Sequence, residues 1–114
     1  MSNEIKNHVL SIIDDLNNGT QEWRDSWEIS ENPEPFTAYD YLEGVLDINW
    51  ILNSDRTLKG ARLLVAFGGP NIWIDTSKGI VEGAWWGDSY SDSYNTNSEF
   101  ARELDDALET VFSC

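Results

Sequence analysis

The sequence predicts an α+β fold: N-terminal helices, then a four-stranded antiparallel meander, then a C-terminal helix packed on the sheet. Two observations support this prediction. Apolar residues recur three and four positions apart near both ends of the chain, whereas in the middle they alternate with polar residues. Short sequences rich in Gly, Pro, Ser and Asp separate the alternating stretches, which favours pairing between consecutive strands. Because 114 residues is a typical length for one domain, we expect residues 1–114 to form a single acidic α+β domain.

The first predicted helix covers residues 2–17. Gly19 follows as a natural helix stop, because glycine tolerates the left-handed conformation that often ends a helix. The buried stripe of this helix is expected to contain five apolar residues at helical spacing: Ile5, Val9, Ile12, Ile13 and Leu16.

A short second helix is predicted over about 20–29, and its first residue, a threonine, can cap it. Trp23 and Trp27 stand four positions apart on one face of this helix and are expected in the core. Residues 32–35, Asn-Pro-Glu-Pro, end the helix because proline lacks the amide that a helix interior needs. An acidic capping pattern then predicts a brief helical turn over 37–44.

Four strands are predicted in the middle of the chain. Residues 46–53 alternate apolar and polar side chains, as a half-buried strand does. Residues 59–67 become apolar on both faces toward their end, which indicates a central strand. Two further strands, 71–75 and 80–86, are separated by a glycine-containing turn. The polar residues 87–97 are expected to form a loop.

The last predicted helix begins after that loop, at a capping box formed by Thr96 and Glu99. Packed on the sheet, this helix would close the core from the C-terminal side. Its buried face is expected to contain Phe100, Leu104, Leu108 and Val111.

The charge of the chain is strongly unbalanced, because 21 Asp and Glu residues oppose 7 Lys and Arg residues and the formal net charge is −14. A phosphate-binding face needs clustered basic residues, so direct nucleic-acid binding is excluded as the main activity, and anionic lipid surfaces are disfavoured.

The sequence contains neither a signal-peptide pattern nor an apolar run of about 18 residues. The single cysteine, Cys114, excludes an internal disulfide. We therefore expect a cytoplasmic protein.

No residue pattern points to catalysis. His8, the single histidine, is expected on an exposed helix surface, and Cys114 lacks the cationic neighbours that lower a thiol pKa. The Gly-Gly-Pro sequence at 68–70 predicts a tight turn, because a phosphate loop needs more glycines and a following lysine. We therefore expect no enzyme, no cofactor and no metal site.

Two alternatives stay open around the last strand and the acidic loop. Asp88, Asp92 and Glu99 fall at positions 1, 5 and 12 of a register like that of a calcium-binding EF-hand loop, although serine stands where the sharp turn needs glycine. Carboxylates near a common turn, beside tryptophan, also allow a small hydrolase or a carbohydrate-binding protein. The residues that would serve such a function are Asp75, Glu82, Asp88 and Trp85.

Trp73 has an isoleucine on either side in the sequence, so in a strand its side chain points away from both. It either packs under the long loop or serves as an exposed anchor for a partner, a role in which tryptophan is enriched. Both possibilities stay open.

Acids concentrate in the predicted helices, and between residues 14 and 47 only Arg24 opposes ten of them. One interpretation is a solvated face that keeps the protein soluble. The other is that the carboxylates imitate a row of phosphates and occupy the basic groove of a nucleic-acid-binding protein. On the second interpretation the contact residues are Asp14, Asp15, Glu22, Asp25, Glu28, Glu31, Glu34, Asp40 and Glu43, with Trp73 as the anchor.

The most distinctive sequences, 68–75 (GGPNIWID) and 83–88 (GAWWGD), resemble a recurrent element of short proteins from bacterial mobile elements. In size, charge and acid-lined helices over a short sheet, the chain resembles the small acidic inhibitors encoded by phages and other mobile elements, notably anti-CRISPR and anti-restriction proteins. The resemblance implies a non-enzymatic inhibitor that binds a defence nuclease in the bacterial cytoplasm, with a CRISPR Cas effector as the leading target because its nucleic-acid channel is strongly basic. An immunity protein that neutralises a basic nuclease toxin is the alternative.

Overall fold

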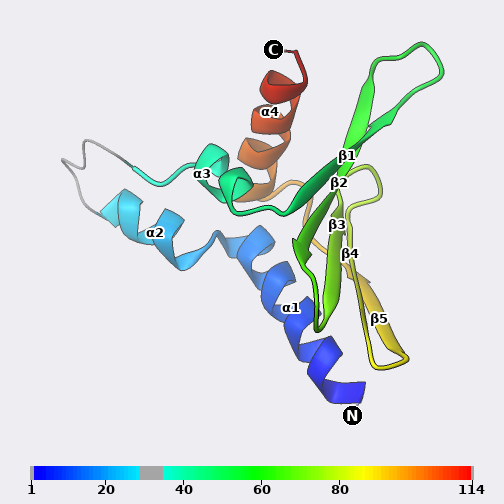
Figure 1. The fold of residues 1–114 in the computed structure, drawn as a ribbon. Helices are drawn as coiled ribbons and strands as arrows, with labels where there is room; N and C mark the ends of the chain where they lie inside the picture. Colours follow the sequence, from blue (N-terminus) through cyan, green and yellow to red (C-terminus); the bar gives the residue numbers. More distant parts are fainter. Residues whose placement is uncertain (1, 29–34, 114) are drawn as a thin grey trace.

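The structure, a computed structural model, describes residues 2–28 and 35–113 and confirms the α+β class. A five-stranded antiparallel sheet is flanked by N-terminal helices and a C-terminal helix (Figure 1). The elements in chain order are α1 (Ser2–Asn18), α2 (Gln21–Glu28), α3 (Ala38–Glu43), β1 (Asp47–Leu52), β2 (Leu58–Ala66), β3 (Asn71–Asp75), β4 (Ile80–Trp85), β5 (Asp88–Ser93) and α4 (Glu99–Ser113).

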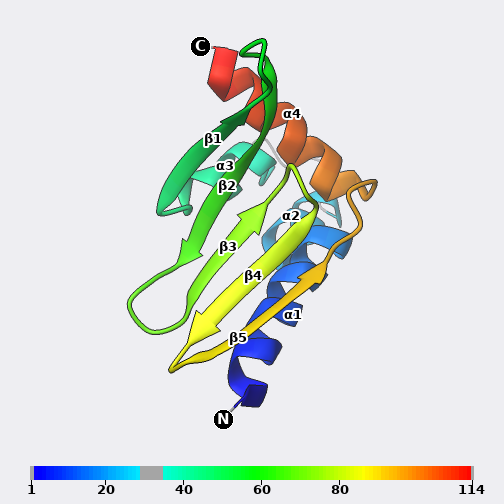
Figure 2. The ribbon, with the colours of Figure 1, turned by 90° about the vertical axis from the view of Figure 1, so that its right-hand side faces the viewer.

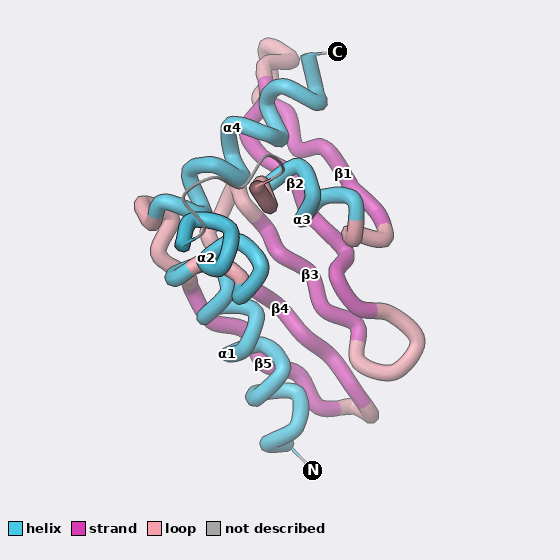
Figure 3. Tube along the Cα trace, turned by 90° about the vertical axis from the view of Figure 1, so that its left-hand side faces the viewer, coloured by secondary structure: helices cyan, strands magenta, loops and turns pink. Residues whose placement is uncertain are grey.

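The sheet is a meander with the strand order β1-β2-β3-β4-β5, and the helices cover one of its faces (Figures 2 and 3). Helix α1 crosses β4 closely at Gly83. A Cβ atom on Gly83 would lie 2.7 Å from both Ile5 Cδ1 and Val9 Cγ2, so only glycine fits without displacement. The opposite face of the sheet carries Trp73 of β3, which pairs with Glu82 of β4.

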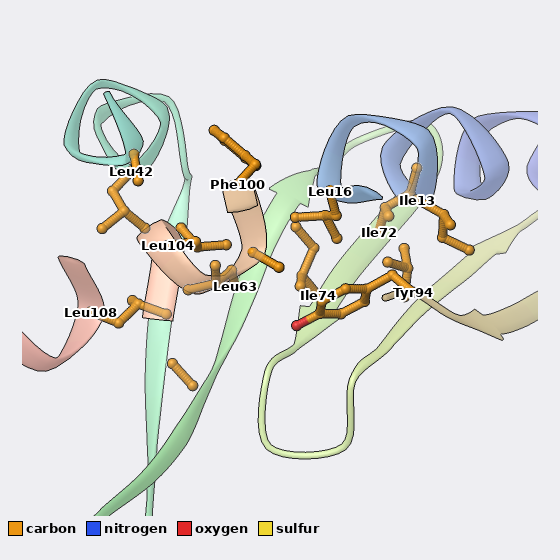
Figure 4. Packing of buried hydrophobic residues seen from close by; sticks show 14 of the residues in the cluster. Ile13, Leu16, Leu42, Leu63, Ile72, Ile74, Tyr94, Phe100, Leu104 and Leu108 are labelled. Atoms are coloured by element: carbon orange, nitrogen blue, oxygen red, sulfur yellow. The ribbon is translucent and has the colours of Figure 1, made fainter. Parts of the chain in front are cut away.

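The core lies between the helix layer and the sheet (Figure 4). The predicted helix stripes are confirmed in the main, since Ile5, Val9 and Leu16 of α1 are buried. Val111 is the exception: its side chain is exposed, because the last turns of α4 instead turn the ring of Phe112 toward Trp50, at 5.3 Å. The sheet and α4 contribute Ala61, Leu63, Ile72, Ile74, Val81, Phe100, Leu104 and Leu108.

The prediction of a loop over 87–97 is wrong, because β5 occupies the middle of this segment and is the fifth strand of the sheet. A tight turn at Trp86 and Gly87, with φ values of 55° and 81°, joins β4 directly to β5. Such a two-residue turn with positive φ at both positions matches the right-handed twist of a hairpin. The strand is polar because it lies at the edge of the sheet, where its side chains remain largely in water.

The helix ends follow local hydrogen bonds. Helix α4 is capped by Ser98 rather than by Thr96, since Ser98 Oγ accepts from the amide of Ala101 at 3.1 Å and donates to the carbonyl of Leu16 at 2.6 Å. The cap predicted for the third helix is confirmed, because the amide of Thr37 donates to Asp40 Oδ2 at 2.8 Å. In residues 2–28 and 35–113, no helix combines the length and the apolar run that a membrane crossing needs.

Candidate functional site

The acids that sequence reasoning singled out lie on the helix layer, on the side of the sheet that Figure 3 shows in front. Glu28 is the last residue of α2, and its side chain lies outside the described part of the chain. Residues Glu31 and Glu34 also lie outside it. The six described acids are called the acidic helix surface below: Asp14 and Asp15 of α1, Glu22 and Asp25 of α2, and Asp40 and Glu43 of α3.

Asp15 lies where carboxylates gather on this surface. Burial raises the pKa of the Asp15 carboxyl above its ordinary value, and the neighbouring charges of Asp14 and Glu22 raise it further. Arg24 acts in the opposite direction, but its guanidinium also donates to Gln21 Oε1 at 3.2 Å. A cation supplied from outside would therefore relieve repulsion between carboxylates at this point.

Asp15 and Asp40 line one shallow hollow of about 300 Å³ between α1, α3 and β2. The rest of the lining is mainly apolar: Ile12, Phe36, Tyr41, Val45 and Val65, with Gly44. Burial, and then the charge of Asp15, raise the pKa of the Tyr41 hydroxyl, so this phenol stays neutral. Carboxylates beside an apolar lining match a lysine or arginine side chain, which has an aliphatic stem and a charged head.

Glu103 of α4 belongs to the acidic helices but is committed to the fold. Its Oε2 accepts hydrogen bonds from the indole nitrogen of Trp23 at 3.1 Å and from the amide of Ala38 at 2.8 Å. One carboxylate therefore connects α2, α3 and α4. Trp23 is buried, as predicted, whereas the side chain of Trp27 lies outside the described residues.

Trp73 lies on the opposite face of the sheet from the acidic helix surface, so the structure does not bring the two together. The guanidinium carbon of Arg62 stands 4.3 Å from the centroid of the Trp73 ring, and its Nη2 contacts Glu82 Oε2 at 3.3 Å. These residues border a shallow hollow of about 630 Å³ on the open face of the sheet. Trp73 is half-buried there, beside the side chains of Asn71, Ser89 and Ser91.

Trp86 is an aromatic residue whose position sequence reasoning missed. The sequence predicts Trp86 at the end of a strand, but it occupies the tight β4–β5 turn with a positive φ and 86% of its surface exposed. The signal that could have located the turn is the glycine that follows it, because a residue–Gly pair is typical of a two-residue hairpin turn. Trp85, its neighbour, is half-buried, and its ring meets that of the exposed His8 edge to face at 5.9 Å.

The carboxylates considered for hydrolysis are engaged in local contacts. Asp75 is buried, and its Oδ1 accepts from Ser77 Oγ at 2.6 Å and from the amides of Ser77 and Lys78 at 3.0 and 3.1 Å. Glu82 contacts Arg62. Asp75 therefore shapes the β3–β4 turn, an Asx-type arrangement, instead of facing a substrate.

The calcium-like register of residues 88–99 does not form a loop around an ion. Asp88 and Asp92 stand near opposite ends of the extended strand β5, and Asp92 Oδ1 accepts from the amide of Ser93 at 2.8 Å. In the described ranges no group of three or more His, Cys, Asp or Glu side chains could hold a metal ion. The chain turns at residues 68–70, as expected, and Gly68 has a φ of 100°. Cys114 lies outside the described residues.

The basic residues lie mainly on the sheet and its turns. Arg56, Lys59, Arg62 and Lys78 belong to β2 or to the turns beside β1 and β3, and acids such as Asp55 and Glu82 also lie on the sheet and its turns. No protein-family model, curated protein or solved structure matches this chain. Among the residues that the structure describes, two surface features have distinct chemistry: the acidic helix surface and the open face around Trp73.

Proposed function

We propose that the protein is a non-enzymatic inhibitor that binds a basic nucleic-acid-handling defence protein through the acidic helix surface. A CRISPR Cas effector nuclease is the leading target, because its nucleic-acid channel must be lined with basic side chains. The carboxylates of α1, α2 and α3 would occupy sites that phosphates otherwise fill. The inhibitor would therefore compete with nucleic acid and cleave nothing itself.

The observation that carries the proposal is the electrostatic environment of Asp15. Its pKa is raised by burial and then by Asp14 and Glu22, and lowered by Arg24, so three carboxylates lie close together here beside one cation of the chain. A partner with clustered Lys and Arg would supply further counter-charge. Complementary charge of this kind accelerates association and makes it sensitive to salt.

The hollow beside Asp15 and Asp40 supports the same partner chemistry. A purely solvated acidic face needs no apolar lining, whereas this hollow places Phe36 and Val65 beside the carboxylates. An arginine or lysine inserted there would bury its stem and pair its head.

The test is a DNA-cleavage assay with purified Cas9-type effectors, in which the protein is added either before or after guide RNA and target DNA. We expect inhibition when it is added first, with a strength that falls as salt rises. The triple variant Asp14→Lys, Glu22→Lys, Asp25→Lys should lose at least about tenfold in inhibition while keeping its circular dichroism spectrum.

A matched control changes the net charge by the same amount on α4: Glu99→Lys, Asp106→Lys, Glu109→Lys, all of which are exposed. The control should inhibit nearly as well as the unchanged protein, because its substitutions leave the acidic helix surface intact. Full inhibition by a folded variant of the acidic helix surface would contradict the proposal. So would the absence of binding to every effector tested at low salt.

A further inference from the structure

The hollow on the open face of the sheet carries balanced charge (Figure 2). Its volume of about 630 Å³ falls in the range that small-molecule sites have. Among its described lining residues, the charged side chains are Arg62 and Glu82, whose opposite charges meet at 3.3 Å. In a chain with a net charge of −14, a ligand placed in this hollow would therefore meet a lining without net charge.

The strand register determines how the side chains of the hollow are arranged. Directly paired residues of antiparallel strands lie on the same face, so two rows of side chains cross β3, β4 and β5 here. The first row is Asn71, Ala84 and Ser89. The second row is Trp73, Glu82 and Ser91. The short side chains of the first row leave space beside the large ring that begins the second.

Arg62 holds the Trp73 ring from the other side. It pairs with Asp75 in the row beyond, and its guanidinium carbon stands 4.3 Å from the centroid of the ring. Its Nη2 contacts Glu82, which is paired with Trp73. A cation that stacks on an indole and is itself anchored by a carboxylate restricts the motion of the ring. An aromatic surface that is oriented in advance loses less entropy when a ligand packs against it.

The polar groups around this ring include both donors and acceptors of hydrogen bonds. The hydroxyls of Ser89 and Ser91 can do both, Arg62 donates and Glu82 accepts. A neutral sugar matches this set, because its hydroxyls also donate and accept, while the C–H groups of one ring face can pack against an aromatic surface. An anionic ligand matches it less well, because its oxygens only accept and would be repelled by Glu82.

We propose that this hollow binds a neutral oligosaccharide, with one sugar ring packed against Trp73 and its hydroxyls bonded to the side chains of β4 and β5. Because the hollow is shallow, a single sugar would keep much of its surface in water, whereas the adjoining sugars of an oligosaccharide can extend over the sheet. Of the residues considered from sequence for carbohydrate binding, Glu82 belongs to this hollow. Asp75 shapes a turn, and Trp85 packs against His8 of α1. The inference is independent of the proposed function, since the acidic helix surface lies on the other side of the sheet.

The test is isothermal titration calorimetry of the full chain with neutral tetrasaccharides built from glucose, N-acetylglucosamine, mannose, galactose and xylose. We expect at least one of them to bind with a dissociation constant of about 0.1–1 mM. Its affinity should be the same at about 0.05 M and 0.5 M salt, because no net charge is neutralised. The inhibitor proposal requires salt-sensitive binding, so either proposal can fail without the other. No binding of any of the five at about 10 mM would overturn the sugar site.

Two substitutions locate the bound sugar. Trp73→Ala should weaken binding at least about tenfold, because it removes the ring against which the sugar packs. Ser91→Lys should do the same by filling the hollow from an exposed position of the edge strand, where a long side chain does not disturb the core. Ser93→Lys is the matched control: Ser93 is exposed on the same strand and face but outside the lining, so its variant should bind normally. Equal affinities of the two lysine variants would contradict the proposed site.

The chemistry of the ligand is tested with two further probes, tetragalacturonate as an acidic sugar and adenosine as a flat neutral base. We expect both to bind more weakly than the best neutral tetrasaccharide. Tighter binding of either probe in the hollow, with loss of that binding in Ser91→Lys, would overturn the assignment to a neutral oligosaccharide. Glu82→Gln should weaken the neutral sugar several-fold, because it removes a charged acceptor and the anchor of Arg62. The same substitution should strengthen tetragalacturonate, because the positive charge of Arg62 is then unopposed in the hollow.

Discussion

The indole nitrogen of Trp23 in α2 donates a hydrogen bond to Glu103 Oε2 in α4, at 3.1 Å, across 80 positions of the sequence. The same oxygen accepts from the amide of Ala38 at the start of α3. A carboxylate shared in this way differs from the other acids of the helices, because the packing of three helices depends on it. Glu103 therefore maintains the fold and is not one of the acids that we propose to contact a partner.

Glu103→Ala should therefore destabilise the protein by about 2 kcal/mol, because two donors that are partly removed from water lose their acceptor. Urea denaturation followed by tryptophan fluorescence measures the change. Glu109→Ala, an exposed acid on the same helix, is the control and should stay within about 0.5 kcal/mol. Equal effects of the two substitutions would show that the shared carboxylate does not hold the helices together.

Gly83→Ala should destabilise by about 1–3 kcal/mol, because the new methyl group would lie 2.7 Å from side-chain atoms of Ile5 and Val9. Ile5→Val removes one of those atoms, so the double variant should lose less than the sum of the two single losses. A double-mutant cycle by thermal denaturation measures that difference. Strict additivity would contradict the close approach of α1 to β4.

Trp86→Asn should leave stability unchanged or raise it by up to about 1 kcal/mol. Tryptophan at a φ of 55° is strained and is 86% exposed, whereas asparagine before glycine is favoured in this turn. The midpoint of urea denaturation measures the effect, and Trp85→Asn, which removes a half-buried ring, should destabilise. A clear loss of stability in Trp86→Asn would mean that the Trp86 ring contributes contacts to the fold.

Asp105→Asn should change how stability depends on pH. Burial, and then the charge of Asp106, raise the pKa of Asp105 to about 6, so the folded state binds this proton more tightly than the unfolded chain does. Its contribution to stability is therefore largest at low pH and is lost as pH rises from about 4 through 6. The variant should be more stable than the unchanged protein at pH 7.5, by less than about 1 kcal/mol because the carboxyl keeps contact with water.

The difference in melting temperature between Asp105→Asn and the unchanged protein, measured from pH 4 to pH 8, isolates this residue from the general repulsion among acids. The difference should grow in favour of the variant as pH rises. A difference that is constant across the range would contradict the raised pKa. Asp106→Asn should shift the transition toward lower pH, because it removes the neighbouring negative charge.

Much of the fold could be predicted because its signals are local. Strand 71–75 lies between a glycine-proline turn and a glycine-containing turn, and its predicted bounds coincide with those of β3. Strand β5 was missed because its regularity comes from backbone pairing with β4, which side-chain patterns do not record. Ser98 was passed over as a cap because its second partner, the carbonyl of Leu16, is distant in the sequence.

For the candidate site, the sequence predicted which helices and strands carry its residues but not how their side chains pair. The enrichment of acids in the helices was visible in the sequence, and the alternation around Trp73 indicated that it faces away from the core. The pairing of Arg62 with Trp73 and Glu82 depends on the register of three strands, which no local pattern fixes. The role of Glu103 depends on contacts 65 and 80 positions away.

The hydrogen bonds to Glu103 fix the relative positions of α2, α3 and α4 in the unbound protein. Because α2 and α3 are attached to α4 before any encounter, the carboxylates they carry already have defined relative positions. Hydrogen bonds from Asn18 to Asp14 of α1 and from Gln21 to Asp25 of α2, each 2.7 Å long, further restrict one carboxylate on each of these helices. A surface that is ordered in advance loses less conformational entropy on association. If the proposed function holds, loosening the three helices should weaken binding to the target even when every acid is retained.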